Sequence, residues 1–450
     1  MFKRKPKLHN YQSRGYQPFD RGWRGYQKKI RIYDERRQTL RRIPWYFVGL
    51  VIFAFLIKGG FHLLEKRMLS ASADHTVSIY APEVTPLDHN SIQAILPIAR
   101  FNNLDTKIFD FKRDNHSYQI HTSLNMTLQK GIMNALDTRH ANRIGIIVME
   151  PDTGRILAMV SHDDDDPHSN ACLKADLPAA SIFKIVTATA ALEAGGLEYQ
   201  SRMAFNGGKF TLYRNQLVDQ ENQYTNYTSL KDSFAESINP VFGKLGKNLL
   251  GKSLLENYAH AYLFNCDIEF DLPAEQSFLE ISDKPFNLAE IASGFNRTTT
   301  ISPLHAAMIA GMVANGGKLV KPSIVDVASQ DHKTVYRRQA GALSQAIRPL
   351  TTESLQKLMN ATITSGTARN QFVGISTDPI LSRLDMGGKT GSINNNRRQI
   401  RYDWFAGYAS NPDGSEKIAV GIIVAHKEYI GKRAATYFRE IVSRYFENIN

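Results

Sequence analysis

Cysteine is almost absent from this chain, which holds only Cys172 and Cys266 among its 450 residues. Two positions 94 residues apart supply no disulfide framework, so the fold depends on a hydrophobic core. The two thiols can pair in an oxidising compartment or stay free and buried, and the sequence leaves both outcomes open. Internal repeats are also absent, and only one apolar run is long enough to cross a membrane. These absences exclude a disulfide-rich scaffold, a repeat array and a protein with several membrane spans.

The formal charge of +12 is concentrated at one end of the chain. Residues 1–42 hold 14 Lys or Arg against 3 Asp or Glu, so the other 408 residues sum to about +1. Because the remainder is close to neutral, the charge does not indicate a nucleic-acid-binding surface. We expect this basic tail to lie in the cytoplasm, where anionic lipid head groups attract it.

One apolar run, IPWYFVGLVIFAFLIKGGFHLL, follows the tail at residues 43–64. A helix of this length covers about 33 Å at about 1.5 Å per residue, which is enough to cross a bilayer. Trp45 lies where an aromatic belt is expected, and Lys58 can snorkel to the far interface. The Arg-rich flank predicts an N-terminal transmembrane helix of the inner (cytoplasmic) membrane, with the remainder of the chain on the periplasmic or extracytoplasmic side. A cleaved signal peptide fits the long basic flank poorly, and a Lys-interrupted core helix is the other alternative.

The rest of the chain divides into a short irregular part and a long regular one. Residues 65–117 have no strong period and predict a stalk or small pedestal. From Tyr118 onward, RIGIIVME and GRILAMVS predict a hairpin, and DMGGKTGS, RYDWFAGYAS and KIAVGIIVAHKEY predict three later strands. The final piece, RAATYFREIVSRYFENI, has helical spacing. Strands at both ends with helices between them indicate an α/β fold over residues 118–450, an antiparallel sheet flanked by helices.

Ser181 and Lys184 are two polar residues near the start of an apolar helical run, SIFKIVTATAALEAGG. Positions three apart share one face of a helix, so the hydroxyl and the amine can reach hydrogen-bond distance. A neutral lysine can accept the serine proton and activate the oxygen as a nucleophile, and burial or a nearby cation would lower the lysine pKa toward that role. Ser-x-x-Lys alone is a weak signal, because Ser354 and Lys357 repeat it on what we interpret as a solvated helix face.

Two further motifs make the signal specific. FAESINPVF places Ser237 and Asn239 two apart, 56 residues after Ser181, and MGGKTGS places Lys389 on a predicted strand 152 residues after Ser237. Ser-x-x-Lys and Lys-Thr-Gly, with a related middle motif, mark serine β-lactamases and penicillin-binding proteins. The order and spacing predict that three distant segments meet in one cleft.

The middle motif has a chemical task beside Ser181 and Lys184. Ser237 can relay a proton between Lys184 and a leaving amine. Asn239 can hold a peptide amide and position the Lys184 side chain. The alternative is structural, since both residues precede Pro240 and can cap a helix that begins there.

The third motif supplies contacts to a substrate. Lys389 offers a positive charge, and Thr390 a hydroxyl, to a substrate carboxylate. Gly391 leaves room for a substrate backbone beside the strand. The backbone N–H groups of Ser181 and Ser392 would form an oxyanion hole. Lys389 as an ordinary charge on an edge strand is the alternative, but the glycines around it favour close backbone approach.

At these motifs the sequence resembles the penicillin-binding proteins, the D,D-transpeptidases that cross-link peptidoglycan. The resemblance covers about residues 118–450 and includes the flanking stretches TSGTARN and DWFAGYA. It implies the transpeptidase fold shared with serine β-lactamases, with Ser181 acylated by D-Ala-D-Ala stem peptides and equally by β-lactam antibiotics. It implies no cofactor, no metal and no nucleic acid. The implied partners are stem peptides, β-lactams, the membrane and other cell-wall synthesis proteins.

The chain departs from the family pattern in two places. The family usually has Pro-Gly before the nucleophile, whereas Pro178 is followed here by Ala179 and Ala180, whose methyl groups can narrow or stiffen the turn. Residues 65–117 are also shorter than the usual pedestal of the monofunctional members, and no glycosyltransferase domain fits before the transpeptidase. The chain is therefore similar to a monofunctional class B protein with a shortened pedestal.

Other functions stay open at this point. A D,D-carboxypeptidase or a β-lactamase would use the same acyl-enzyme, although the middle motif and the missing Glu-x-x-Leu-Asn element disfavour a β-lactamase. A non-catalytic β-lactam sensor or cell-wall scaffold is a further alternative, which the intact motifs disfavour. The acidic run HDDDDPH at residues 162–168 is interpreted as a solvated loop and not as a metal site.

Overall fold

The computed structural model describes residues 89–395 and 399–447. The basic tail, the apolar run at 43–64 and residues 65–88 of the predicted stalk lie outside these ranges, so the anchor stays a prediction. Within the described ranges, none of the helices combines the length and the apolarity that crossing a membrane requires. The described residues belong to one compact unit, which begins at Val84.

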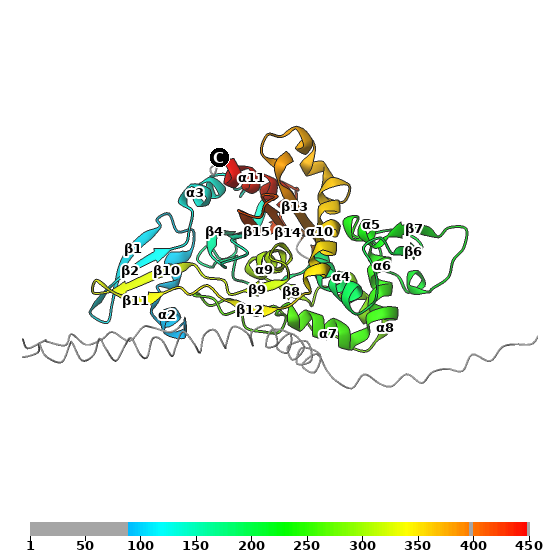
Figure 1. The fold of residues 1–450 in the computed structure, drawn as a ribbon, viewed down its shortest axis with the longest axis horizontal. Helices are drawn as coiled ribbons and strands as arrows, with labels where there is room; N and C mark the ends of the chain where they lie inside the picture. Colours follow the sequence, from blue (N-terminus) through cyan, green and yellow to red (C-terminus); the bar gives the residue numbers. More distant parts are fainter. Residues whose placement is uncertain (1–88, 396–398, 448–450) are drawn as a thin grey trace, which may run out of the picture. The chain divides into compact units, whose positions relative to one another are not determined.

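A five-stranded antiparallel sheet forms the centre of this unit, as the sequence predicts (Figure 1). The strand order is β13-β14-β15-β3-β4. The strands are β3 (Ala141–Met149), β4 (Ile156–Asp163), β13 (Asp385–Asn395), β14 (Ile400–Ser410) and β15 (Lys417–His426). Strand β13, which carries the Lys-Thr-Gly motif, pairs with β14 alone and is therefore an edge strand. No second strand of the described residues pairs with its outer edge, where a further strand could add.

Helices cover both faces of this sheet. Helices α3 (Met126–Asn134) and α11 (Ala434–Glu447) lie on one face, and α9 (Pro303–Ala314) lies on the other (Figure 1). Along β15, Val420 and Ile422 belong to the core cluster of α3 and α11, whereas Ala419 and Ile423 belong to the cluster of α9. A strand buried on both faces reads as a continuous apolar run, which explains the pattern that the sequence shows.

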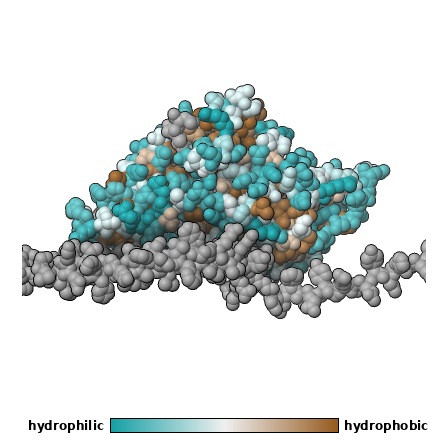
Figure 2. Space-filling model, in the orientation of Figure 1, coloured by the Kyte–Doolittle hydropathy of each residue, from teal (hydrophilic) through white to brown (hydrophobic). Residues whose placement is uncertain are grey.

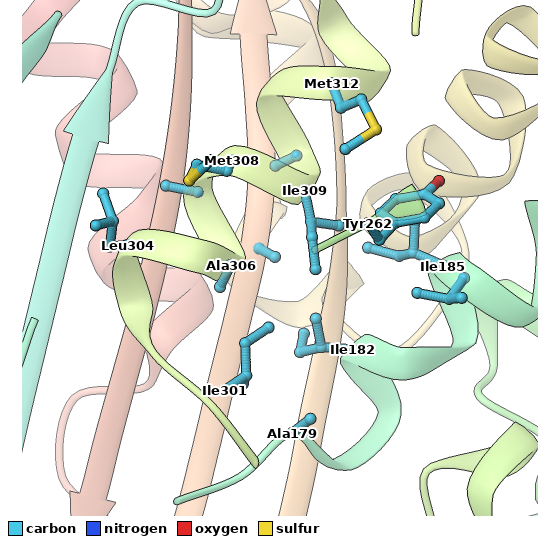
Figure 3. Packing of buried hydrophobic residues seen from close by; sticks show 14 of the residues in the cluster. Ala179, Ile182, Ile185, Tyr262, Ile301, Leu304, Ala306, Met308, Ile309 and Met312 are labelled. Atoms are coloured by element: carbon cyan, nitrogen blue, oxygen red, sulfur yellow. The ribbon is translucent and has the colours of Figure 1, made fainter. Parts of the chain in front are cut away.

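Helix α9 joins the sheet to the segment that carries Ser181. Its N-cap is Ser302, whose side chain accepts a hydrogen bond from the His305 N–H, and Pro303 fits the first turn. Its apolar side chains, including Ile309, pack near Ile182 and Ile185 (Figure 3). A Cβ on Gly421 of β15 would lie 2.1 Å from the Pro303 carbonyl oxygen, so only glycine permits this close approach.

A mostly helical lobe packs beside α9 and β13. Its helices are α4 (Lys184–Glu193), α5 (Leu230–Ala235), α6 (Asn239–Lys244), α7 (Gly251–Ala261), α8 (Pro285–Ser293) and α10 (Pro349–Thr364). Its short strands pair as β5 (Leu177–Pro178) with β8 (Thr300–Ile301), and β6 (Arg202–Phe205) with β7 (Asn226–Ser229). Its irregular turns are η2 (Ala180–Phe183), η3 (Arg214–Leu217) and the π-helical η4 (Leu245–Leu250). The turns η5 (Arg369–Phe372), η6 (Ile375–Thr377) and η7 (Leu381–Arg383) follow α10 and pack instead in the core cluster of α11.

A second sheet corrects one predicted boundary. Strands β1 (Ile108–Arg113), β2 (His116–Thr122), β10 (Val325–Gln330) and β11 (Lys333–Arg337) form it in the order β1-β2-β10-β11. The predicted limit between residues 117 and 118 therefore falls inside β2. The hairpin was not visible as a period because β1 exposes most of its side chains. The remaining elements are α2 (His89–Ile95), η1 (Ile98–Phe101), and β9 (Lys318–Val320) paired with β12 (Ala342–Gln345).

Two open questions from the sequence are answered by contacts. Cys172 is buried, Cys266 is partly buried, and both thiols are free. In the acidic run, Asp163 is buried and its carboxylate lies 2.7 Å from Arg143, so this residue does not belong to a solvated loop. Within the described ranges no cluster of His, Cys, Asp and Glu could hold a metal ion.

The face seen in Figure 2 is mostly hydrophilic, with smaller hydrophobic patches.

Candidate active site

Ser181 and Lys184 lie on one turn at the start of the buried helix. Ser181 is in η2 and Lys184 is the first residue of α4. Residues three apart eclipse one another in a 3₁₀ turn, which brings Lys184 Nζ to 2.8 Å from Ser181 Oγ. Ser181 is half-buried and lines a cleft of about 590 Å³, whereas Lys184 is completely buried beneath it. The predicted contact between hydroxyl and amine is present.

The surroundings of Lys184 favour its neutral form. Its pKa lies well below 10.5, chiefly because burial disfavours the charged amine and further because Lys389 adds a nearby positive charge. Its amine also contacts the Asn239 Oδ1 atom at 2.8 Å and the Ser293 carbonyl oxygen. With a neutral amine, the 2.8 Å contact is one in which the Ser181 hydroxyl donates to Nζ. This is the arrangement of a base in contact with its nucleophile.

The Ser-x-Asn motif lies in the turn between α5 and α6. Ser237 has φ +56°, and Asn239 begins α6 directly before Pro240. Both side chains line the cleft. The N-cap of α6 is Ile238 and no side chain caps this helix, so the capping interpretation is wrong for Asn239. Its amide instead joins Lys184 to the Phe210 carbonyl oxygen, to which Nδ2 donates at 3.0 Å.

Lys389 is fully buried on β13 and is not an ordinary edge-strand charge. Burial lowers its pKa to about 7. Its Nζ donates to the Thr390 carbonyl oxygen at 3.0 Å and lies 5.4 Å from the centre of the Phe234 ring. The Thr390 hydroxyl contacts that of Thr367 at 2.5 Å. Lys389 therefore lies below the cleft, with the two threonine hydroxyls at the cleft surface.

Gly391 allows β13 to approach the nucleophile turn. A Cβ there would lie 3.2 Å from the Trp404 Cβ and 3.3 Å from the Ala179 carbonyl oxygen. The missing side chain of Gly391 therefore makes room for the backbone of the Ser181 turn, and the sequence-based expectation of room for a substrate backbone is a second use of the same gap. Trp404 lies opposite Gly391 on the neighbouring strand β14, and its Nε1 donates to the Pro178 carbonyl oxygen at 2.8 Å, which ties the sheet to the segment before Ser181. This bond fixes Ser181 relative to the Lys-Thr-Gly strand.

The cleft joins the three motifs. It is lined by Ser181, Ser237 and Asn239 from the helical lobe and by Thr390 and Ser392 from β13. Sequence reasoning missed other lining residues: Phe210, Phe295, Thr367 and three arginines, Arg297, Arg401 and Arg433. Thr367 lies in TSGTARN, one of the flanking stretches of the family resemblance, from which no place in the cleft was predicted. The others come from segments without a recognisable motif.

The turn before the nucleophile holds an alanine in a glycine conformation. Ala180 has φ +49°, in the left-handed region that L-residues occupy at a cost of about 1–2 kcal/mol. Its neighbour is equally constrained: a Cβ on Gly294 would lie 2.0 Å from the Ala180 carbonyl oxygen. The departure from Pro-Gly therefore stores strain directly beside Ser181.

We expect Ala180→Gly to stabilise the protein by about 0.5–1 kcal/mol, because relief of the left-handed strain exceeds the extra chain entropy of glycine. For a domain of this size, such a gain raises Tm by about 1 °C. Thermal unfolding of both proteins measures the change. Ala179→Gly is the matched control, since residue 179 has φ −63° and should lose stability. A lower Tm for Ala180→Gly would show that the turn is not strained.

A serine hydroxyl in contact with a buried lysine, beside the edge of an antiparallel sheet that bears Lys-Thr-Gly, is the arrangement of a serine acyl-transfer enzyme. Residues 144–443 match the family model described as "Penicillin binding protein transpeptidase domain". The chain therefore belongs to the penicillin-binding protein transpeptidase family.

Curated relatives and solved structures agree with this assignment. The chain is 24% identical over 279 residues to stage V sporulation protein D of Bacillus subtilis, an alignment that covers 59% of this chain and 42% of that protein. It is 24% identical over 380 residues to the peptidoglycan D,D-transpeptidase PbpA of Mycolicibacterium smegmatis, which covers 72% of each. The D,D-transpeptidase domain from Eggerthella lenta has the same fold, with a TM-score of 0.60, 22% identity and coverage of 78% and 86%.

An imipenem acyl-enzyme structure of penicillin-binding protein A from M. tuberculosis also shares the fold. Its TM-score is 0.58 at 20% identity, with coverage of 72% of this chain and 79% of that one. The predicted fold class is thus confirmed for the transpeptidase domain.

Proposed function

We propose that this chain is a peptidoglycan D,D-transpeptidase that cross-links D-Ala-D-Ala stem peptides through an acyl-enzyme on Ser181. The observation that carries the proposal is the buried Lys184 amine, which lies 2.8 Å from the Ser181 hydroxyl and whose pKa is lowered by burial and by Lys389. Family membership and the names of the relatives support the same reaction. β-Lactams would acylate the same oxygen.

Acylation begins when Ser181 attacks the carbonyl carbon between the two D-alanines. Lys184 accepts the hydroxyl proton as the new C–O bond forms, so the oxygen never carries a full charge. The carbonyl oxygen becomes an oxyanion, which the N–H groups of Ser181 and Ser392 would stabilise. Asn239 keeps Lys184 in position through its 2.8 Å contact.

Collapse of this intermediate breaks the C–N bond and releases D-alanine. The leaving amine needs a proton, which Ser237 passes from Lys184. A second stem peptide then brings an amine to the ester carbon, and Lys184 accepts its proton as the new C–N bond forms. Lys184 returns this proton to the Ser181 oxygen, which leaves as the C–O bond breaks and the cross-link is completed. Water in place of that amine gives a carboxypeptidase.

The edge of β13 is suited to hold the donor peptide. A peptide that pairs with this edge gains backbone hydrogen bonds, as in strand addition. Thr390, Thr367 and Lys389 would bind its C-terminal carboxylate, with Lys389 acting through charge because it lies below the surface. Gly391 keeps this strand close enough to Ser181 for the peptide to reach both.

We propose that residues 1–42 form a cytoplasmic tail and 43–64 a single membrane span, and that the stalk or small pedestal predicted at 65–117 connects this span to the transpeptidase domain. The charge asymmetry and the apolar run support this arrangement. Peptidoglycan lies outside the membrane, so an exported transpeptidase domain suits the substrate.

Product analysis tests the reaction. The full-length protein is incubated with a D-Ala-D-Ala peptide, with and without a D-amino acid as acceptor amine, and the products are identified by mass spectrometry. A transpeptidase gives the exchanged peptide whenever acceptor is present. Hydrolysis alone would identify a carboxypeptidase, and rapid turnover of nitrocefin a β-lactamase. No covalent penicillin adduct would overturn the acyl-enzyme proposal.

The pKa of Lys389 predicts a falling alkaline limb. As pH rises through about 7, the free enzyme loses the Lys389 charge, so kcat/KM for acylation by a carboxylate-bearing penicillin should fall about tenfold per pH unit. The methyl ester of the same penicillin lacks the anion and should show no such limb. Stopped-flow competition with a fluorescent penicillin measures both profiles. Parallel profiles for acid and ester would contradict a charge role for Lys389.

A further inference from the structure

The active-site cleft ends in positive charge on the side away from Lys389. Arg297 follows α8, Arg401 lies on β14 and Arg433 precedes α11, and all three line the cleft. The cleft lining contains no aspartate or glutamate among the described residues. None of these arginines belongs to the three motifs, so the reaction chemistry does not account for them.

Arg433 is held and neutralised by the protein. Its Nε donates to the Asp403 carboxylate at 2.8 Å and its Nη2 donates at 3.2 Å. Asp403 is buried and also accepts from the Ala434 N–H, so the pair is fixed in place. The Arg433 side chain keeps 34% of its surface exposed. This residue shapes the end of the cleft but adds little net charge.

Arg297 and Arg401 are different, because no carboxylate of the described residues pairs with either. Arg297 is exposed, and its Nη2 donates to the Asn394 carbonyl oxygen at 2.8 Å, which holds it beside β13. Arg401 pairs with Asn394 in the β13–β14 register, so the two arginines meet at the same strand position. The Arg401 Nε is buried and has no hydrogen-bond partner in the described part of the chain. Two uncompensated guanidinium groups therefore lie at one end of the cleft.

The distance along β13 relates this end to the peptide. Asn394 is four residues beyond Thr390, which is about 13 Å of extended strand. A donor peptide whose C-terminal carboxylate lies at Thr390, and which pairs antiparallel with β13, places its third or fourth residue from the C-terminus beside Arg297 and Arg401. Guanidinium groups bind carboxylates through paired hydrogen bonds.

We propose that Arg297 and Arg401 form a subsite for a carboxylate that the donor peptide carries upstream of its D-Ala-D-Ala end. This inference rests on the proposed function, since it uses the predicted direction of the donor along β13. The subsite would make the enzyme prefer donor stem peptides that carry this carboxylate, and it predicts faster acylation by β-lactams with an anionic side chain. Arg433 forms the wall behind the subsite.

Two matched penicillins test the subsite on the full-length protein. One carries a glutaryl side chain that ends in a carboxylate, and the other carries the corresponding glutaramide. The second-order acylation rate constant of each is measured by competition with a fluorescent penicillin. We expect the acid to react about tenfold faster, and the preference to fall below twofold in the Arg297→Gln, Arg401→Gln double variant. The readout is the ratio of the two rate constants, which a general loss of folding would leave unchanged.

Arg337→Gln removes the same charge from the exposed surface of β11 and should keep the tenfold ratio. Equal acylation by acid and amide in the unaltered protein would overturn the subsite while leaving the acyl-enzyme intact. A tenfold ratio that survives in the double variant would also overturn it. No adduct with either penicillin would instead refute the proposed function, and the subsite with it.

Discussion

Ser181→Ala is expected to abolish covalent labelling by a fluorescent penicillin. The acyl-enzyme bond requires the Ser181 oxygen, and no other group in the cleft combines a hydroxyl with a neutral amine at 2.8 Å. The substitution removes one half-buried oxygen and should change the free energy of unfolding by about 1 kcal/mol or less. Labelling on a denaturing gel, followed by mass mapping of the labelled peptide, measures the effect. Intact mass should show no penicilloyl adduct.

Ser354→Ala is the matched control for this experiment. Ser354 and Lys357 repeat the Ser-x-x-Lys spacing on α10, where Lys357 is exposed and stacks 4.5 Å from the Tyr199 ring. Because no second cation and no buried amine accompany Ser354, this variant should be labelled like the unaltered protein. Labelling that persists in Ser181→Ala would place the nucleophile elsewhere and would refute the proposed mechanism.

The sequence could predict the contact between Ser181 and Lys184 because a spacing of three residues restricts where they lie. Both lie on one turn, 2.8 Å apart. The sheet was also predictable, because strands such as β15 are buried on both faces and read as long apolar runs. In each case a local pattern of a few residues determines the outcome.

The parts that escaped prediction depend on contacts between distant segments. Arg297 and Arg401 are 104 positions apart and belong to no motif. They meet because Arg401 pairs with Asn394 in the β13–β14 register and Arg297 donates to the Asn394 carbonyl oxygen. The strain at Ala180 likewise arises because Gly294 and the sheet fix the backbone there. The sequence shows that Ala180 departs from the Pro-Gly pattern of the family. That its φ angle is positive depends on the tertiary structure and could not be read from the sequence. The first hairpin was missed because its strand β1 exposes most of its side chains.

The two buried lysines explain why this site costs stability. Each amine has a pKa below that of an exposed lysine, so the unfolded chain binds more protons than the folded one at neutral pH. Stability therefore rises with pH from the folded pKa up to the unfolded value near 10.4. The enzyme thus holds a base that folding alone would disfavour, which is common at catalytic sites.

Lys184→Met should separate the stability cost of the buried amine from its proposed role as the base. Methionine has a similar volume and no charge, so it fills the buried space while removing the base. Acylation by penicillin should fall by about 10²–10⁴, the range associated with loss of a general base. The Asn239 and Ser293 oxygens lose one donor, which costs about 1–3 kcal/mol, and the removal of a buried amine offsets this at neutral pH.

The pH dependence of stability tests the same variant without reference to activity. As pH rises from 7 toward 9.5, the free energy of unfolding of the unaltered protein should increase, relative to that of Lys184→Met, by up to about 1.4 kcal/mol per pH unit. The reason is that only the unaltered protein has an amine at residue 184, which binds a proton more tightly in the unfolded chain than in the folded one. Urea unfolding of both proteins at several pH values measures this difference. A constant difference in unfolding free energy would show that Lys184 has an ordinary pKa, and it could not then act as the neutral base that Ser181 needs.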